Sequence, residues 1–381
     1  MSKQVLERKI KVLHVVGSMT AGGLETLIMN LYRNMDRSKV QFDFAVQTNE
    51  KCFYDDEIIQ KGGKIIPHPK PSDNLIKYKM ALKETIKKYG PYDVIHSHVL
   101  FFSGVVIDIA NKENIPIRIA HSHTSNNSKY NSLLRKMYKR IMRKKIINNA
   151  THLIGCSSEA CEFLFGNNSL EAGITRHFPN AIDPKRFKTL KKDSNYLTNE
   201  LKLPDDSLII GHIGRFTKAK NHVLLIEVFT EYLKRNANAH LILVGDGEER
   251  KCIEQLVYEN MIEENVHFLG LREDIEKILS AIDLFLFPSL YEGLGIALIE
   301  AQAAGVPCLI SDTIPVEADL NIGLAQRRNL SDKNDEWVQA IDEVKKIESP
   351  SWDNRESALK DTGYDINISS KKLLKIYSGE E

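Results

Sequence analysis

The segment from 287 to 300 (FPSLYEGLGIALIE) places two carboxylates and a glycine-rich turn beside the expected start of a helix. Glu292 lies in the turn, and Glu300 lies within the helix among apolar neighbours that predict its burial, where a carboxylate needs a partner. The carboxylates can accept hydrogen bonds from hydroxyl-rich groups such as ribose and a hexose. Backbone amides at a helix start can hold a phosphate, and here they belong to Leu294, Gly295 and Ile296.

A second charged loop follows the apolar run 208–213 and carries three cations in the segment 214–221 (GRFTKAKN). The Arg215 guanidinium can grip phosphate oxygens with two donors, and Lys220 supplies a point charge. A solvated turn is the alternative. Cations near a helix N-terminus oppose the helix dipole, however, so this arrangement favours a bound anion. A diphosphate leaving group needs such neutralisation.

A third loop, 20–25 (TAGGLE), follows the first apolar run of the chain. Gly22 and Gly23 would let the backbone approach a ligand closely, next to a helix N-terminus. The loop lacks the third glycine of a dinucleotide fingerprint and the Gly-Lys-Ser/Thr of a P-loop. A tight turn without a ligand is the alternative.

Two His-Ser-His segments each come at the end of an expected strand. Because alternate residues of a strand face the same way, His96 with His98, and His121 with His123, would each present two imidazoles to one side. This spacing suits a divalent metal. No carboxylate cluster at a recognisable spacing accompanies the histidines, so a single imidazole that donates a hydrogen bond to a sugar is the simpler interpretation, and we expect no metal.

The segment 133–147 holds seven cations and no acid. Its apolar residues recur at helical spacing, which usually means a helix that packs on the core with a solvated basic face. Docking to an anionic membrane is the alternative. The cations are Arg135, Lys136, Lys139, Arg140, Arg143, Lys144 and Lys145.

Short apolar runs alternate with helical patterns along the whole chain, which predicts βαβ units and parallel sheets. Two such series, separated by a polar stretch at 188–199, predict an α/β protein of two doubly wound, Rossmann-like domains. We place the domains at 1–190 and 191–361, with a final helical segment, 362–381, that crosses back to the first. The expected strands are 11–16, 42–46, 64–67, 94–98, 117–121, 153–156, 208–213, 239–244, 266–269, 284–287 and 307–310.

The bulk composition excludes several classes of protein. The net charge of +1 in 381 residues provides no overall electrostatic attraction to nucleic acid. No apolar run is long enough to cross a bilayer. The N-terminus has no apolar signal segment. The five cysteines form no metal-type pair and indicate reduced thiols. We therefore expect a cytoplasmic protein, with contact to the inner face of the membrane as an option.

Several motifs together resemble those of the retaining family 4 glycosyltransferases. The segment 292–300 matches the family's E-x7-E signature, Arg215 and Lys220 match its R-x4-K pair, and Gly22-Gly23-x-Glu25 fits its early loop. The continuation 301–307, the segment 243–247 and the segment 179–183 also fit. Ala181 stands where the family often has glycine, which resembles a subgroup that builds bacterial surface polysaccharides.

The resemblance implies a GT-B fold, with the sugar acceptor bound mainly by the N-terminal domain. It implies that the diphosphate lies on Arg215 and Lys220, that Glu300 holds the ribose, and that Glu292 contacts the donor sugar. It also places a histidine against that sugar, either His123 or His121. The remaining donor-binding positions would be Gly22, Gly23, Gly214, Gly245, Gly293, Leu294, Gly295 and Ile296.

The resemblance further implies transfer of a hexose-type sugar, by default from a UDP-sugar, to a glycan or lipid-linked acceptor with retention and without a metal cofactor. Three alternatives stay open. A sugar-nucleotide hydrolase or epimerase shares the fold, and a metal-dependent hydrolase would use the His-Ser-His pairs. A catalytically silent carbohydrate-binding protein is disfavoured because all four charged residues of the two motifs are present.

Overall fold

The computed structural model describes residues 8–124, 132–188, 193 and 195–381, which form two compact units. Unit 1 comprises residues up to Asn180 together with Ile366–Glu381, and unit 2 comprises Ala181–Asp365. The division falls after Asn180, whereas the sequence placed it after residue 190. The physical reason is that the intervening chain binds unit 2: Ile182 bridges to Asp365, and Arg186 forms an ion pair with Glu276.

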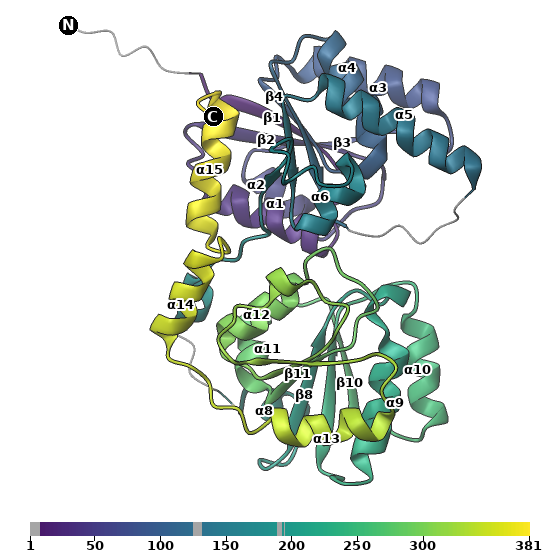
Figure 1. Ribbon diagram of the computed structural model, residues 1–381, viewed down its shortest axis with the longest axis vertical. Helices are drawn as coiled ribbons and strands as arrows, with labels where there is room; N and C mark the ends of the chain where they lie inside the picture. Colours follow the sequence, from purple (N-terminus) through teal and green to yellow (C-terminus); the bar gives the residue numbers. More distant parts are fainter. Residues whose placement is uncertain (1–7, 125–131, 189–192, 194) are drawn as a thin grey trace, which may run out of the picture. The chain divides into compact units, whose positions relative to one another are not determined.

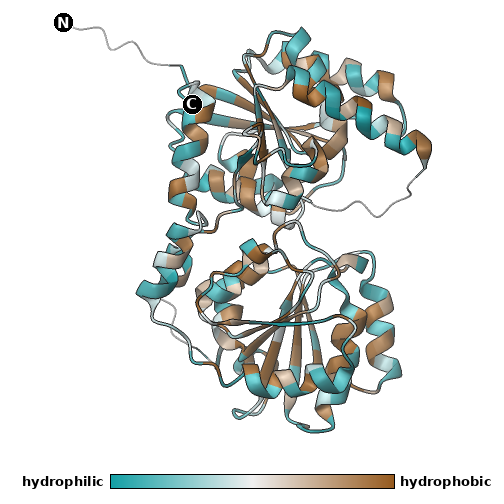
Figure 2. Cartoon of the chain, viewed as in Figure 1, coloured by the Kyte–Doolittle hydropathy of each residue, from teal (hydrophilic) through white to brown (hydrophobic). Residues whose placement is uncertain are grey.

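Unit 1 is built on a parallel sheet of seven strands in the order β3-β2-β1-β4-β5-β6-β7 (Figure 1). Its central strands are largely buried and apolar, as expected for a sheet covered on both faces (Figure 2). The strands are β1 (Ile10–Val15), β2 (Val40–Val46), β3 (Ile65–Pro67), β4 (Val94–Ser97), β5 (Ile117–Ser122), β6 (His152–Gly155) and β7 (Arg176–His177).

Two different layers of helices cover this sheet. One face packs on α3, α4, α5 and α6 through a core that includes Leu82, Val106 and Ile146. On the other face lie α1 and the C-terminal helix α15, which contact each other, and α15 also contacts β1 (Figure 1). The helices are α1 (Gly23–Asn34), α2 (Asp55–Gln60), α3 (Leu75–Tyr89), η1 (Leu100–Phe102), α4 (Ser103–Lys112), α5 (Leu133–Asn149), α6 (Ser158–Phe165) and α15 (Ile366–Ser378).

Unit 2 repeats the architecture with a parallel sheet of six strands in the order β10-β9-β8-β11-β12-β13. Its core includes the fully buried Trp337, Phe229 and Leu241. The strands are β8 (Leu208–Ile213), β9 (Ala239–Val244), β10 (Val266–Gly270), β11 (Leu284–Phe287), β12 (Cys308–Ser311) and β13 (Ala325–Arg328). The helices are α7 (Lys185–Lys188), α8 (Asn195–Leu201), η2 (Lys218–Lys220), α9 (His222–Leu233), α10 (Arg250–Glu259), α11 (Ile275–Ala281), α12 (Ile296–Ala304), η3 (Val316–Ala318), α13 (Asn334–Val344) and α14 (Trp352–Asp361).

The alternation of strands and helices is confirmed, and the ends of the predicted strands agree within two residues. The final helical segment, predicted at 362–381, forms the shorter helix α15. The polar stretch at 188–199 is not only a linker, because α8 begins at Asn195; residues 189–192 and 194 of that stretch lie outside the described part. Tyr196 donates a hydrogen bond to Asp274, and Arg272 contacts Glu200 at 2.5 Å, so α8 belongs to unit 2.

No helix within the described residues is both long and apolar enough to cross a membrane.

Candidate active site

The loops after β8, β9 and β11 are joined by backbone hydrogen bonds at the carboxyl edge of the unit 2 sheet. Gly214 N–H donates to Val244 at 2.9 Å, and Leu290 N–H donates to Ala219 at 2.7 Å. Parallel α/β sheets bind ligands at this edge. The fold therefore brings together two motifs that are far apart in the sequence, 214–221 and 287–300.

Gly245 is required by the close approach of two of these loops. Its φ is +136°, and a Cβ there would lie 2.1 Å from the carbonyl oxygen of Gly214. Only glycine fits both the backbone conformation and the space. The donor-binding role of Gly245 stays a prediction, and its structural role is to let the two loops approach each other.

Lys220 and Glu292 form the charged centre of the site. The Lys220 ammonium lies 2.6 Å from a Glu292 oxygen and 4.6 Å from the centroid of the Phe287 ring. Their side chains are only 17% and 12% exposed. Gly214 lies directly alongside, since a Cβ there would be 3.1 Å from the Lys220 chain. Arg215 is exposed to solvent on the same loop.

Glu300 is buried in α12, as its apolar neighbours predicted, with 7% of the residue exposed. Burial raises the pKa of its carboxyl from 4.5 to about 7, and the nearby Arg186 opposes this rise while Glu276 adds to it. Glu300 is thus poised between its neutral and charged forms near neutral pH. A carboxylate in this state can gain from a ligand that donates hydrogen bonds.

The turn before α12 has the geometry that the glycine pattern predicted. Gly295 precedes the first helical residue with φ +94° and ψ +55°, a left-handed conformation that favours glycine. Leu294 is buried, whereas Gly293 and Ile296 are partly exposed. As at the start of any α-helix, the first amides of α12 have no acceptor one turn earlier, although the Leu298 amide donates to the Gly295 carbonyl at 2.9 Å.

In unit 1 the loop 20–25 leads directly into a helix. Gly22 is the extended N-cap residue of α1, its carbonyl accepts from the Thr26 amide at 2.8 Å, and Gly23 is exposed. The predicted position of these glycines at a helix N-terminus is confirmed. Their approach to a donor remains a prediction.

The two His-Ser-His segments lie on adjacent strands, and their imidazoles form one buried array. The ring centroids are 4.2 Å apart for His96 and His98, and 3.8 Å apart for His121 and His123, so each pair faces one side as predicted. The pairs join through a contact of 3.2 Å between His96 Nε2 and His121 Nδ1, and one of 2.9 Å between His98 Nδ1 and His123 Nε2.

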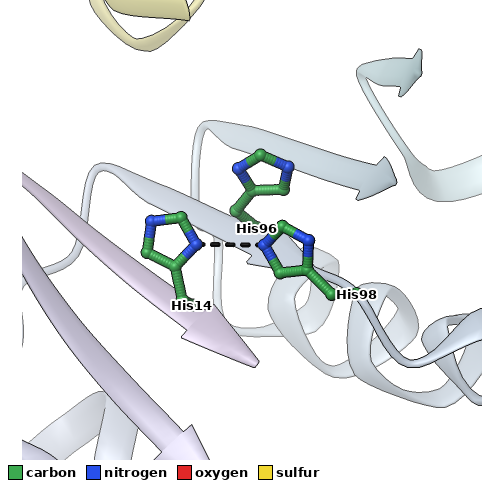
Figure 3. A group of neighbouring side chains, drawn as sticks. All are labelled: His14, His96 and His98. Carbon is green, nitrogen blue, oxygen red and sulfur yellow. Dashed lines mark hydrogen bonds between the residues drawn. The ribbon is translucent and has the colours of Figure 1, made fainter. Parts of the chain in front are cut away.

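His14 on β1 and Tyr377 on α15 complete the array, and the sequence analysis missed both. His14 Nδ1 lies 3.0 Å from His98 Nε2 (Figure 3), and the Tyr377 hydroxyl lies 2.8 Å from His96 Nδ1. The sequence does hold one indication of the role of His14, which is its position in the first predicted strand. The parallel register of β1 with β4 pairs it with His96.

Burial keeps these imidazoles neutral. Desolvation lowers the pKa of His14, His96, His98 and His121 well below 6.5, and the neighbouring histidines lower it further. The pKa of His123 falls to about 3, also through burial. The array can therefore donate and accept hydrogen bonds, or ligate a metal, without first losing a proton.

The basic segment forms α5, which packs on the core, but only part of its apolar side is covered. Within the segment only Met142 and Ile146 are buried, whereas Leu134 is 75% and Ile141 is 47% exposed. Leu133, Met137 and Tyr138 are exposed too.

The seven cations of α5 also divide into two groups. Lys136, Arg140 and Lys144 are exposed and recur every four residues on one side of the helix. The others are only partly exposed and contact the protein: Arg143 donates to the Phe163 and Leu164 carbonyls, for example.

Both units of the chain match known protein families. Residues 21–186 match the family described as Glycosyltransferase Family 4, and residues 193–364 match the family described as Glycosyl transferases group 1. The chain is 35% identical over 369 residues to the putative glycosyltransferase EpsF of Bacillus subtilis, covering 97% of this chain and 96% of that protein.

A more distant relative is the Escherichia coli UDP-Gal:alpha-D-GlcNAc-diphosphoundecaprenol alpha-1,3-galactosyltransferase, at 26% identity with 80% of each chain covered. Among solved structures, HepE of Anabaena in complex with UDP and glucose is similar in fold, with a TM-score of 0.77, 18% identity, and 97% and 99% of the two chains covered. WaaG, a glycosyltransferase involved in lipopolysaccharide biosynthesis, has a TM-score of 0.70 at 17% identity, with 97% and 100% covered. The chain therefore belongs to the family 4 glycosyltransferases and has the GT-B fold.

Proposed function

We propose that the enzyme transfers a hexose-type sugar from a UDP-sugar to a hydroxyl of a glycan or lipid-linked acceptor during synthesis of a surface polysaccharide. The observation that carries the proposal is the charged centre of unit 2, where Lys220 and Glu292 pair on loops fixed at the carboxyl edge of one sheet. Glu300 is buried in α12, the helix that follows the second of these loops. The UDP and glucose bound to HepE, and the lipid-linked acceptor in the name of the Escherichia coli relative, support the choice of substrates.

The leaving diphosphate would be stabilised by cationic side chains and helix amides, without a metal ion. The Lys220 ammonium, which now contacts Glu292 at 2.6 Å, would donate to a diphosphate oxygen. Arg215 on the same loop and the first amides of α12 would add further donors. The exchange releases Glu292 to accept hydrogen bonds from the sugar hydroxyls, while Glu300 accepts from the ribose.

In this proposal His123, or the adjacent His121, donates a hydrogen bond to the donor sugar from unit 1. The acceptor hydroxyl attacks the anomeric carbon from the side of the leaving group, and a phosphate oxygen accepts its proton. Retention at the anomeric carbon follows from this same-face attack.

A thermal-shift panel tests the donor assignment. UDP, GDP and ADP, each free and as its glucose conjugate, are added with and without EDTA. We expect UDP compounds to raise the melting temperature most, equally in both conditions, since a ligand that binds only the native state stabilises it. Stabilisation by another nucleotide, or one that EDTA removes, contradicts the assignment.

The hydrolase and epimerase alternatives are distinguished by the products. Incubation with UDP-glucose and a panel of lipid-linked and free glycan acceptors should release UDP only together with a glycosylated acceptor. Release of free sugar would show a hydrolase, and conversion of the donor to an epimer without acceptor would show an epimerase. Either result would contradict the proposed transfer. The anomeric configuration of the product, measured by NMR, tests retention.

The exposed side of α5 is proposed to bring the enzyme to the anionic inner face of the membrane, where a lipid-linked acceptor lies. Lys136, Arg140 and Lys144 would each contribute about 1 kcal/mol near an anionic surface, beside apolar side chains that include Met137 and Ile141. Vesicles rich in phosphatidylglycerol should bind the enzyme, and phosphatidylcholine vesicles should not.

The matched control for this membrane contact is a change on the protein-facing side of α5. The variant Lys136→Glu/Arg140→Glu should lose binding to the anionic vesicles, whereas Lys145→Ala, at a lysine that contacts Asp108 at 3.4 Å, should retain most of it. Equal binding of all three proteins would refute the role of α5.

A further inference from the structure

Three imidazoles gather at the carboxyl edge of the unit 1 sheet. His98 directly follows β4, His121 lies near the end of β5, and His123 directly follows β5. Each of the three can offer one ring nitrogen such that all three nitrogens lie within 4.8 Å of one another. This spacing is that of ligands around a single ion.

One buried ring nitrogen of this group has no hydrogen-bond partner within the described part of the chain. His121 is buried and uses Nδ1 toward His96, which leaves its Nε2 without a partner. His123 uses Nε2 toward His98, and a side-chain hydrogen bond with Asn180 also acts on its ring. Buried polar groups normally have partners, and each exception calls for an explanation. A ligand is one such explanation.

The remaining contacts of the array resemble the outer partners of a metal site. Histidines that bind metals almost always have their second nitrogen fixed by another group. His14 Nδ1 lies 3.0 Å from His98 Nε2, and His96 Nε2 lies 3.2 Å from His121 Nδ1. His96 is itself fixed through its other nitrogen, 2.8 Å from the Tyr377 hydroxyl.

We propose that His98, His121 and His123 form a binding site for a first-row divalent transition ion such as zinc or cobalt(II). The ion would be bound by His98 Nδ1, His121 Nε2 and His123 Nε2. In this arrangement His14 keeps its contact with the other ring nitrogen of His98, and His96 keeps its contact with that of His121. At Zn–N distances of about 2.0–2.1 Å, two ligands of a tetrahedral ion lie about 3.3 Å apart. The contact of 2.9 Å between His98 Nδ1 and His123 Nε2 would therefore open by a few tenths of an ångström.

Binding of the ion moves a proton but releases none. One of the two facing nitrogens carries the hydrogen of the present hydrogen bond, and that imidazole shifts its proton to its other nitrogen as the ion binds. Three neutral imidazoles leave a fourth coordination position for water.

The other group of three histidines, His14, His96 and His98 (Figure 3), is a weaker candidate for the same ion. Both ring nitrogens of His96 already have protein partners. All three residues are also buried, whereas His123 is partly exposed and gives the ion a route from solvent.

The test is a titration of the full-length enzyme, first stripped with EDTA and dialysed, with CoCl₂. Imidazole-bound tetrahedral cobalt(II) absorbs strongly in the visible range, so the readout is independent of transfer activity. We expect saturable visible bands at one ion per chain, and competition by zinc. The variants His121→Asn and His123→Asn should each weaken binding more than 100-fold, whereas the outer-partner variant His14→Asn should weaken it about 10- to 100-fold.

A second histidine pair provides the matched control. His240 and His267 in unit 2 lie 3.1 Å apart through their ring nitrogens, and His240→Asn should leave the cobalt bands unchanged. Far-ultraviolet circular dichroism checks that each variant is folded, and His123 is the least buried of the three proposed ligands. Absence of visible bands, or bands that survive His123→Asn and disappear with His240→Asn, overturns the proposal.

Discussion

Replacement of Glu300 by glutamine should stabilise the enzyme at alkaline pH and leave its stability unchanged at acid pH. Glu300 is buried, and its carboxyl has a pKa of about 7 in the folded enzyme against 4.5 for the ordinary group. The folded state holds this proton more tightly than the unfolded state does. The contribution of protonated Glu300 to the free energy of unfolding is therefore fully present below about pH 4.5 and is lost as the pH rises toward 7. The amide variant has no proton to lose.

The size of the effect follows from the same two values. Raising the pKa from 4.5 to about 7 corresponds to about 3 kcal/mol of stability lost between these pH values. For a unit of this size that free energy corresponds to a shift in melting temperature of roughly 6 to 12 °C.

The assay is thermal denaturation of the wild type and of Glu300→Gln at intervals from pH 4.5 to pH 8.5. The exposed Glu264, changed to glutamine, is the matched control and should follow the wild type throughout. We expect the difference between the wild type and Glu300→Gln to grow with pH and to level off above pH 8. A constant difference, or a larger one at acid pH, would show that Glu300 is not a carboxyl held neutral by burial.

Three further predictions concern the contacts around the two sites. Lys220→Ala and Glu292→Gln should each abolish transfer and lower the free energy of unfolding by roughly 1–3 kcal/mol, because each removes one partner of a largely buried charge; activity assays and urea denaturation measure both. Gly245→Ala should abolish nucleotide-induced stabilisation, since its Cβ would lie 2.1 Å from a carbonyl oxygen and separate two loops; wild-type thermal shifts would refute this. Tyr377→Phe should lower the free energy of unfolding by about 1–3 kcal/mol, because it leaves the buried His96 Nδ1 unpaired; an unchanged urea midpoint would contradict it.

The parts of the fold that the sequence predicted are those whose signal is local. Continuous apolar runs such as 239–244 identify the buried central strands, because such strands have apolar neighbours on both faces. The edge strands β7 and β13 were missed for the opposite reason. Arg176–His177 is two residues long, and Ala325–Arg328 is mostly polar, so neither has an apolar run.

The parts of the site that the sequence could not predict depend on contacts between distant segments. The burial of Glu300 was predicted from its apolar neighbours in one helix. That Lys220 contacts Glu292 was not, because the contact requires the loops after β8 and β11 to meet. The membership of His14 in the array likewise depends on the register of β1 against β4, which a lone histidine in an apolar strand does not reveal.

Glu300 would face two opposing demands when a nucleotide-sugar donor binds to unit 2. In unit 2 the Lys220 charge is balanced by Glu292, and Glu300 is close to half neutral at pH 7. An incoming diphosphate gains most when Glu300 is protonated, because a second carboxylate would repel it. A ribose hydroxyl gains most when Glu300 is ionised and accepts its hydrogen bond. Because a single carboxyl faces both demands, the affinity for uridine should rise with pH more steeply in the wild type than in Glu300→Gln. The affinity for UDP should differ less between the two proteins, since its charge opposes the gain of the ribose contact.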